Sequence, residues 1–372
     1  MDGLISALEG SSLWLLGLCL LLFLLLMVQL YFVIFVHGKL ALHQVRSREA
    51  IPERQQLVPL SVVICTRNEE QQLAKNLTAL LDQDYPAYEV IVVNDRSDDD
   101  TKWLLKDLAE QNAHLKIVEI AEHVLSQSGK KFGVAMGIKA AQYAHVVFTD
   151  ADCRPASRYW LQHIGAAFER DRKIVLGYVP LPSKKGFANA LIRFGHFYRS
   201  VNYLSYALKG NAYMGLGQNM AFDKALFFKG KGFASHIHVR SGYDELFVNQ
   251  HATRQNTAIS IHKEAHIWKS MPLSLGDYLQ ERKFRKQAYA LYRPGHRRML
   301  NLQRSSAVLF YLALAGVVIV EPTAWPLTVV GYLLRLIAQY AVYIPIATKL
   351  RSPRMLWYLP VMDVLHTFYR KS

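Results

Sequence analysis

Between residues 60 and 149, four short apolar runs alternate with three segments whose apolar residues recur at helical spacing. The runs are continuous and rich in β-branched residues, which is typical of strands buried on both faces of a parallel sheet. This alternation predicts an α/β fold with a mostly parallel sheet and helices on both of its faces. The predicted strands are 60–65, 89–93, 115–120 and 145–149, and the predicted helices are 70–82, 100–112 and 130–143.

Polar side chains follow three of these strands, at 66–70, 94–100 and 150–152. The carboxyl ends of parallel strands share one edge of the sheet, and ligands bind outside that edge. Capping of the next helix accounts for the aspartates at 98–100, because aspartate is a preferred N-cap. Capping does not account for Asp150 and Asp152, since two carboxylates this close repel unless a cation lies between them. A divalent metal with oxygen ligands is the natural partner.

Four segments of this region, SVVICTRNEE, VIVVNDRSDDDT, SGKKFGVAMGIKAA and VVFTDADCRP, resemble motifs of family 2 glycosyltransferases with the GT-A fold. The resemblance covers roughly residues 58–285 and implies a catalytic domain over 58–273. It implies an inverting enzyme that moves a sugar from a nucleotide-diphosphate sugar, expected to be a UDP-sugar. The implied acceptor is a lipid-linked or saccharide molecule, and the implied cofactor is Mg²⁺ or Mn²⁺.

The resemblance also assigns roles on the donor side. Thr66 and Glu69 would lie against the base and ribose, and Asp95 would hydrogen-bond the uracil. Lys130 would approach the diphosphate. The family usually has Asp-Asp-Gly-Ser after the second strand, whereas this chain has Arg96 in place of the glycine. That replacement puts the geometry of the local turn in question.

The metal and base positions follow from the same resemblance. Asp150 and Asp152 would form the DxD pair, with Asp152 the better metal ligand. A metal ion and a lysine neutralise the leaving diphosphate, and the acceptor hydroxyl then needs a base. The acid pair Asp244-Glu245 would supply that base; Glu245 is favoured by its register with Leu246, and a helix N-cap is the competing role for Asp244.

Two further segments match the family in part. Membrane members carry a Gln-x-x-Arg-Trp motif, and this chain has Gln280 followed by Lys283 and Phe284. These three residues are expected near the acceptor, although a lysine offers a point charge where arginine offers a planar fork. The segment 215–217, Gly-Leu-Gly, looks like the family's acceptor-side glycine segment, where the backbone allows close approach.

An apolar run at 13–36 is long enough to span about 30 Å of hydrocarbon. A cleaved signal peptide would need a basic start, a shorter core and a small-residue cleavage site. The acidic N-terminus and the length of the run favour a retained anchor over residues 1–37, followed by a linker over 38–57.

The C-terminal part is also apolar. Residues 306–372 contain stretches at 306–320, 327–347 and 355–369, which predict two to three membrane segments; the last could span if tilted or lie in the interface. The preceding 274–305 is basic and is expected to form amphipathic helices on anionic lipid. Arg335 lies inside the second stretch and either faces other helices or water, or extends to the interface.

Charge placement predicts orientation and excludes some functions. The formal charge is +15, and most of the excess lies between residues 37 and 305, next to the apolar segments. By the positive-inside rule this multi-pass membrane protein would hold its catalytic domain on the cytoplasmic side. No zinc pattern or aromatic nucleic-acid motif accompanies the basic residues, so nucleic acid is not an expected partner. Three cysteines exclude a disulfide scaffold.

A binding role remains the alternative to catalysis. Replacement of the family residues at 96, 283 and 284 is compatible with a degenerate, nucleotide-sugar-binding scaffold subunit of a membrane glycan-synthesis complex. The sequence does not identify the sugar, the acceptor, the length of the product or any partner subunits.

Overall fold

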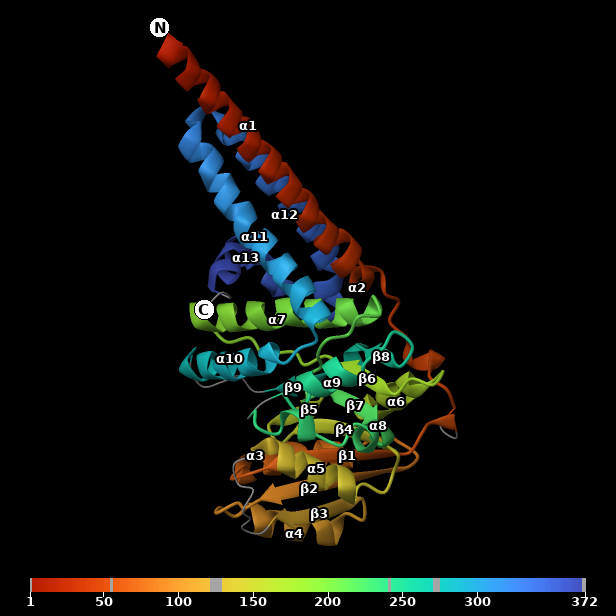
Figure 1. Cartoon of the computed structure of the whole chain (residues 1–372). Helices are drawn as coiled ribbons and strands as arrows, with labels where there is room; N and C mark the ends of the chain where they lie inside the picture. Colours follow the sequence, from red (N-terminus) through yellow and green to blue (C-terminus); the bar gives the residue numbers. More distant parts are fainter. Residues whose placement is uncertain (1, 54–55, 121–128, 240–241, 270–274, 370–372) are drawn as a thin grey trace. The chain divides into compact units, whose positions relative to one another are not determined.

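The computed structural model describes residues 2–53, 56–120, 129–239, 242–269 and 275–369. The chain divides into two compact units (Figure 1). The sheet unit comprises Gln44–Arg293 and Lys349–Arg351; the helical unit comprises the residues through His43, Pro294–Thr348 and those from Ser352 onward.

The sheet unit is built on seven strands in the order β3-β2-β1-β4-β7-β6-β8. The strands β3, β2, β1 and β4 are parallel neighbours. The strand β7 runs antiparallel to both β4 and β6, and β6 pairs in parallel with β8. The seven strands are β1 (Leu60–Thr66), β2 (Tyr88–Asp95), β3 (Leu115–Ile120), β4 (His145–Asp150), β6 (Ile174–Gly177), β7 (Met220–Asp223) and β8 (Thr257–Ser260).

Among the described residues a second sheet is formed by β5 and β9, which pair antiparallel. These strands are β5 (Cys153–Pro155) and β9 (Ile267–Lys269). The helices of the sheet unit are α3 (Glu70–Leu81), α4 (Thr101–Gln111), α5 (Lys130–Ala140), α6 (Trp160–Gly165), α7 (Phe187–Leu208), α8 (Lys224–Lys229), α9 (Glu245–His251) and α10 (Leu275–Ala290).

The predicted α/β fold and its first seven elements are confirmed. Each of the four predicted strands coincides with β1, β2, β3 or β4 to within two residues at either end. The predicted helices coincide with α3, α4 and α5, and the largest difference is that α5 ends at Ala140 instead of residue 143. It ends there because the backbone of Ala141 turns extended, with φ −63° and ψ 125°.

Helices cover both faces of the parallel part of the sheet. Successive strand side chains point to opposite faces. Val62 and Ile64 of β1 therefore pack in one core with residues of α3 and α6. Val63 points to the other face, against α5, where a Cβ on Gly137 would lie 2.4 Å from its side chain. The glycine lets α5 approach the sheet closely and fixes where its N-terminus meets the strand ends.

The helical unit contains three helices that are long and apolar enough to cross a membrane, among the residues described. They are Leu13–Leu42, Pro294–Val320 and Pro322–Lys349. The elements of this unit are α1 (Asp2–Leu30), a π-helical turn (Tyr31–His37), α2 (Gly38–Leu42), α11 (Pro294–Val320), α12 (Trp325–Lys349) and α13 (Leu359–Tyr369).

The lengths of these helices differ from the expected segments. The helix α11 begins at Pro294, so residues 294–305, expected at the interface, form the first part of the same helix as 306–320. The helix α13 has 11 residues, about 17 Å, which is too short to span hydrocarbon. The helices α1 and α11 lie side by side (Figure 1) and share an apolar core that includes Leu22, Leu26 and Phe310.

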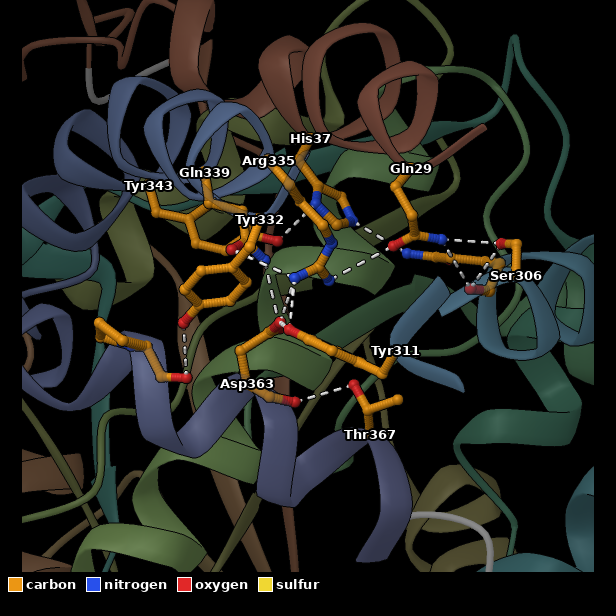
Figure 2. A network of polar contacts seen from close by, with 12 residues as sticks. Gln29, His37, Ser306, Tyr311, Tyr332, Arg335, Gln339, Tyr343, Asp363 and Thr367 are labelled. Atoms are coloured by element: carbon orange, nitrogen blue, oxygen red, sulfur yellow. Dashed lines mark hydrogen bonds and ion pairs between the residues drawn. The ribbon is translucent and has the colours of Figure 1, made fainter. Parts of the chain in front are cut away.

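A network of polar side chains lies inside the helical unit (Figure 2). Arg335 of α12 pairs with Asp363 of α13, and their side chains are only 4% and 5% exposed. Arg335 also donates to the Tyr311 hydroxyl at 2.7 Å and to Gln29 Oε1 at 3.3 Å, while Gln339 donates to Asp363 at 3.2 Å. Arg335 therefore faces other helices, and the alternative that it extends to the interface is wrong.

Candidate active site

The loops that follow β1 and β2 are tied together by hydrogen bonds. Asn68 accepts from the backbone N–H of Asp98 at 2.7 Å, and the N–H of Asn68 donates to the Ser97 hydroxyl at 3.0 Å. The N–H of Glu70 donates to Asp99 at 3.2 Å. The two loops follow neighbouring parallel strands. The polar clusters 66–70 and 94–100 therefore form one surface at the edge of the sheet.

The residues expected to bind the base and ribose lie at this edge, where Thr66 is buried and Glu69 and Asp95 are half-buried. Thr66 donates to Glu69 at 3.1 Å, and burial raises the pKa of the Glu69 carboxyl above its usual value. Asp95 pairs with Arg96 at 2.9 Å. Arg96 has φ 55°, the left-handed conformation that glycine adopts most easily. The turn therefore keeps a glycine-like backbone although arginine occupies the position.

Four charged side chains meet at the end of β4. Lys130 Nζ contacts Asp150 Oδ1, and Lys269 Nζ lies 3.3 Å from Asp150 Oδ2 and 3.5 Å from Asp152 Oδ2. Burial opposes ionisation of Asp150, but Lys130 and Lys269 outweigh it and hold its pKa well below the usual value. We call Lys130, Lys269, Asp150 and Asp152 the ion cluster.

Lys269 reaches the ion cluster through the two-stranded sheet. In its antiparallel register Cys153 is paired with Lys269, so the lysine lies beside the Asp-Ala-Asp segment that precedes β5. Two neighbouring carboxylates need a cation between them, and the chain itself supplies one in Lys269. Sequence reasoning missed Lys269, because nothing in either three-residue strand indicates their pairing.

The donor atoms of this cluster fit a divalent metal of the kind that prefers oxygen. Ligand atoms of Asp150, Asp152 and Cys153 lie within 4.8 Å of one another. Burial raises the pKa of the Cys153 thiol well above its usual value, and the thiol donates to Asp152 at 3.5 Å. The protonated sulfur is a poor ligand, so the two carboxylates are the residues that would hold Mg²⁺ or Mn²⁺.

The acid pair stands at the start of α9. Both carboxylate oxygens of Asp244 accept backbone N–H groups, one from Gly217 at 2.7 Å and one from Glu245 at 2.8 Å. Asp244 thus takes the N-cap position that was its competing role. Glu245 is buried and accepts from the Tyr292 hydroxyl at 3.0 Å. Burial and the neighbouring Asp244 carboxylate raise the pKa of Glu245 to about 8.

The glycine segment 215–217 connects the acid pair to the ion cluster. A Cβ on Gly217 would lie 1.9 Å from the Tyr243 hydroxyl, so any larger residue would displace this tyrosine. Lys130 Nζ lies 5.7 Å from the centre of the Tyr243 ring, within reach of a cation–π attraction. The close backbone approach expected at this segment is therefore used to seat Tyr243 beside Lys130.

A cavity of about 270 Å³ joins these groups. Lys130 and Lys269 line it from the ion cluster, and Asp244 and Glu245 line it from α9. The wall supplied by α10 consists of Tyr278, Glu281, Phe284 and Arg285. Thus Lys130, Asp244, Glu245 and Phe284 of the predicted site share one space.

The other predicted residues do not line this cavity; they are Thr66, Glu69, Asp95, Asp150, Asp152, Gln280 and Lys283. Gln280 and Lys283 are exposed on α10 and are not among the residues that line it. The residues of α10 that line the cavity are Tyr278, Glu281, Phe284 and Arg285. The placement of Gln280 and Lys283 near the reacting groups therefore has no support from this geometry.

Sequence reasoning also missed Lys131 and Tyr292. Lys131 is fully buried and donates to the carbonyl groups of His236 and, at 2.7 Å, Val239. Burial lowers the pKa of Lys131 to about 8. It anchors the segment that leads to the acid pair, whereas Tyr292 holds the Glu245 carboxylate. The second lysine of Gly-Lys-Lys was the available signal for Lys131.

A second group of possible metal ligands comprises His163, His262 and Glu264. The two imidazole rings stack with centroids 4.3 Å apart and planes inclined by 25°. Ring nitrogens bind metals in the plane of the ring, so nearly parallel rings do not direct their lone pairs at one ion. His163 lies 3.4 Å from the Glu264 carboxylate, and the group is explained as a hydrogen-bonded cluster.

Comparison with known sequences identifies relatives of the sheet unit. Residues 61–229 match the family described as glycosyl transferase family 2. Over 107 residues the chain is 32% identical to the poly-beta-1,6-N-acetyl-D-glucosamine synthase of Staphylococcus epidermidis, covering 29% of this chain and 25% of that protein. Over 148 residues it is 30% identical to the beta-monoglucosyldiacylglycerol synthase of Trichormus variabilis, covering 39% and 30%. The chain thus spans a third or less of the length of these relatives.

Comparison with solved structures bears on the fold. A mannosyltransferase from Pyrobaculum calidifontis, in complex with GDP-Man and Mn²⁺, superposes with a TM-score of 0.58 at 17% identity. The match covers 96% of this chain and 100% of that one. Residues 61–229 thus resemble family 2 glycosyltransferases, and the superposition supports a GT-A fold.

Proposed function

We propose that this protein is a membrane-bound inverting glycosyltransferase that moves a sugar from a nucleotide-diphosphate sugar to a lipid-linked or saccharide acceptor. The observation that carries the proposal is the cavity in which two lysines face a buried carboxylate of raised pKa. A departing diphosphate needs cations, and an attacking hydroxyl needs a base. One cavity offers both.

The donor would lie along the sheet edge. Thr66, Glu69 and Asp95 would face the base and ribose, and we propose that the base is uracil. Lys130 would bind the diphosphate at the end of β4. A divalent ion held by Asp150 and Asp152 would supply further neutralisation of the leaving group. The GDP-Man and Mn²⁺ bound to the Pyrobaculum calidifontis enzyme make guanine the alternative base to test.

Glu245 is the better candidate for the base. Both Asp244 oxygens already accept backbone N–H groups, which leaves that carboxylate fixed as a cap. Glu245 accepts from one tyrosine and has a pKa of about 8, so the fraction of Glu245 that can take a proton increases as the pH rises towards about 8 and beyond. A base opposite the leaving group implies a single displacement and inversion at the anomeric carbon.

The acceptor would enter along α10. Tyr278 and Phe284 line the cavity and offer aromatic faces of the kind that sugar rings contact. The three apolar helices support a membrane location and hence a lipid-linked acceptor and contact with membrane lipids. We propose a multi-pass arrangement with the sheet unit on the cytoplasmic side, since Lys39 lies in the last turn of the first of these helices and Arg46 and Arg48 follow it.

The test is a nucleotide-release assay on the detergent-purified full chain. The donors would be UDP-, GDP- and dTDP-sugars with Mn²⁺ or Mg²⁺, and the acceptor a membrane lipid extract. We expect release with one donor and loss of release in Asp152→Ala. Near-normal release by that variant would contradict the assignment of the metal site.

A non-catalytic, nucleotide-sugar-binding subunit of a glycan-synthesis complex is the second candidate. The ammonium of Lys269 between the two carboxylates, and the exposure of Gln280 and Lys283, favour it. Metal-dependent nucleotide binding without release across the donor panel would select this candidate.

A further inference from the structure

Lys269 occupies the space that a metal bound to both carboxylates would need. Its Nζ lies 3.3 Å from Asp150 and 3.5 Å from Asp152, on the oxygen named Oδ2 in each case. Its side chain is 23% exposed, and it lines the cavity proposed for the donor. Lys269 thus faces the two carboxylates and the open cavity at once.

The ion pairs of the cluster show that Lys269 balances the charge of the two carboxylates. Asp150 already has Lys130 as a partner, whereas Asp152 has Lys269 as its lysine partner among the ion pairs of the described residues. Without Lys269 the two acids would share a single lysine and repel each other. With it, the cluster has two positive and two negative side chains and needs no metal to stay together.

A divalent ion and this ammonium cannot both lie between the same two carboxylates. Like charges at such a distance repel strongly in a partly buried site. We infer that Lys269 is an internal counter-ion of Asp150 and Asp152, which competes with the divalent ion and turns to the donor diphosphate when the ion binds. This inference rests on the proposed function, because it assumes that a nucleotide diphosphate enters the cavity.

Coupling between metal and nucleotide follows from this competition. A metal ion that displaces Lys269 leaves an ammonium in the cavity without its carboxylates, and a diphosphate provides a new anionic partner. Each ligand therefore strengthens the binding of the other by the same factor. Removal of the lysine charge should tighten metal binding to the protein alone and reduce its enhancement by nucleotide.

The experiment measures Mn²⁺ binding by the full chain in detergent, from the loss of the free-ion electron paramagnetic resonance signal, with and without UDP or GDP. In Lys269→Gln we expect Mn²⁺ to bind roughly tenfold tighter or more than in the wild type without nucleotide. We expect the nucleotide to enhance binding less than in the wild type. Lys269→Arg keeps the charge and should behave as the wild type.

Lys263→Gln is the matched control. It removes the same charge from an exposed lysine of the same unit and should leave Mn²⁺ binding unchanged. Thermal unfolding of each variant checks that the fold is retained. If Lys269→Gln fails to fold, Lys269→Met replaces it, since its unbranched side chain retains the packing without the charge.

Unchanged or weaker Mn²⁺ binding by a folded Lys269→Gln or Lys269→Met would overturn the inference. So would absence of Mn²⁺ binding by both wild type and variant. These outcomes are separate from those of the transfer assay. Tighter Mn²⁺ binding by Lys269→Gln, without sugar transfer by the wild type, would support the counter-ion and contradict the proposed enzyme. Sugar transfer by the wild type, with Mn²⁺ binding unchanged in Lys269→Gln, would support the proposed enzyme and contradict the counter-ion.

Discussion

Each unit of this protein holds a buried cluster of charged side chains, and the two clusters are built differently. In the helical unit Arg335 and Asp363 are 4% and 5% exposed, and tyrosine and glutamine side chains make further hydrogen bonds with them (Figure 2). In the sheet unit Lys130 is 35% exposed, and both lysines of the ion cluster line a cavity.

The difference indicates what each cluster is for. A cluster buried among helices can only join them, and here it connects α12 and α13 to α1 and α11. A cluster with one side toward a cavity can exchange a protein partner for a ligand. The same ion-pair chemistry therefore serves structure in one unit and, on our proposal, binding and catalysis in the other.

The largest expected effect is on chemistry in the sheet unit. Asp152→Ala removes one of the two carboxylates that would hold the metal, and sugar transfer should fall about a thousandfold or more. Its thermal stability should change little, because Asp152 is 23% exposed and Lys269 keeps Asp150 as a partner. Nucleotide release and thermal unfolding, measured on the same preparation, test this. A large loss of stability in Asp152→Ala would mean that the ion cluster also serves structure, as the cluster of the helical unit does.

The next effect concerns stability in the helical unit. Arg335→Met leaves Asp363 buried without its partner, and we expect a loss of roughly 3 kcal/mol of folding free energy. The double variant Arg335→Met with Asp363→Leu should recover most of it, because no unpaired charge remains. Thermal unfolding in detergent is the measurement. Equal losses in the single and double variants would mean that packing, and not charge, sets the cost.

Features of the fold and of the site could be predicted from the sequence where they depend on neighbouring residues, and not where they depend on residues far apart in the chain. The strands β1 to β4 and the polar residues at their ends follow from local patterns, because buried parallel strands are continuous apolar runs. The need for a cation beside Asp150 and Asp152 also followed from two neighbouring residues. Its source, Lys269, could not be found, since it depends on pairing two short strands far apart in the chain.

Two further features could not be predicted from the sequence: which face of a helix meets the cavity, and which residues of different helices pair. The spacing of Gln280, Lys283 and Phe284 matched a motif, but packing decides which face of α10 meets the cavity, and only Phe284 lies on it. The sequence placed Arg335 in an apolar helix without its partner, because Asp363 belongs to a different helix.

A smaller effect should appear in the pH dependence of transfer. Glu245 must be deprotonated to act as a base, and its pKa is about 8, so the rate should rise with pH up to about 8 and then level off. The Tyr292 hydroxyl stabilises the charged carboxylate and lowers this pKa. Tyr292→Phe should therefore move the rising limb to higher pH, by about one unit. A shift to lower pH would exclude Glu245 as the titrating group.

The smallest effect separates two faces of α10. Arg285 lines the cavity and Lys283 is exposed. Arg285→Ala should raise the KM for the acceptor by several-fold to about tenfold, corresponding to a lost contact of about 1 kcal/mol. Lys283→Ala removes a similar charge and should leave the KM unchanged. The opposite order would restore the role that the family motif suggested for Lys283.

The proposed activity depends most directly on whether Glu245, the buried carboxylate of the sheet unit, takes a proton from an acceptor. The decisive measurement is transfer of labelled sugar into membrane lipid extract by the wild type and by Glu245→Gln, with nucleotide binding followed in parallel. We predict labelled product from the wild type, and no product from a Glu245→Gln protein that still binds nucleotide with Mn²⁺. Product formation by Glu245→Gln at the wild-type rate would contradict the account.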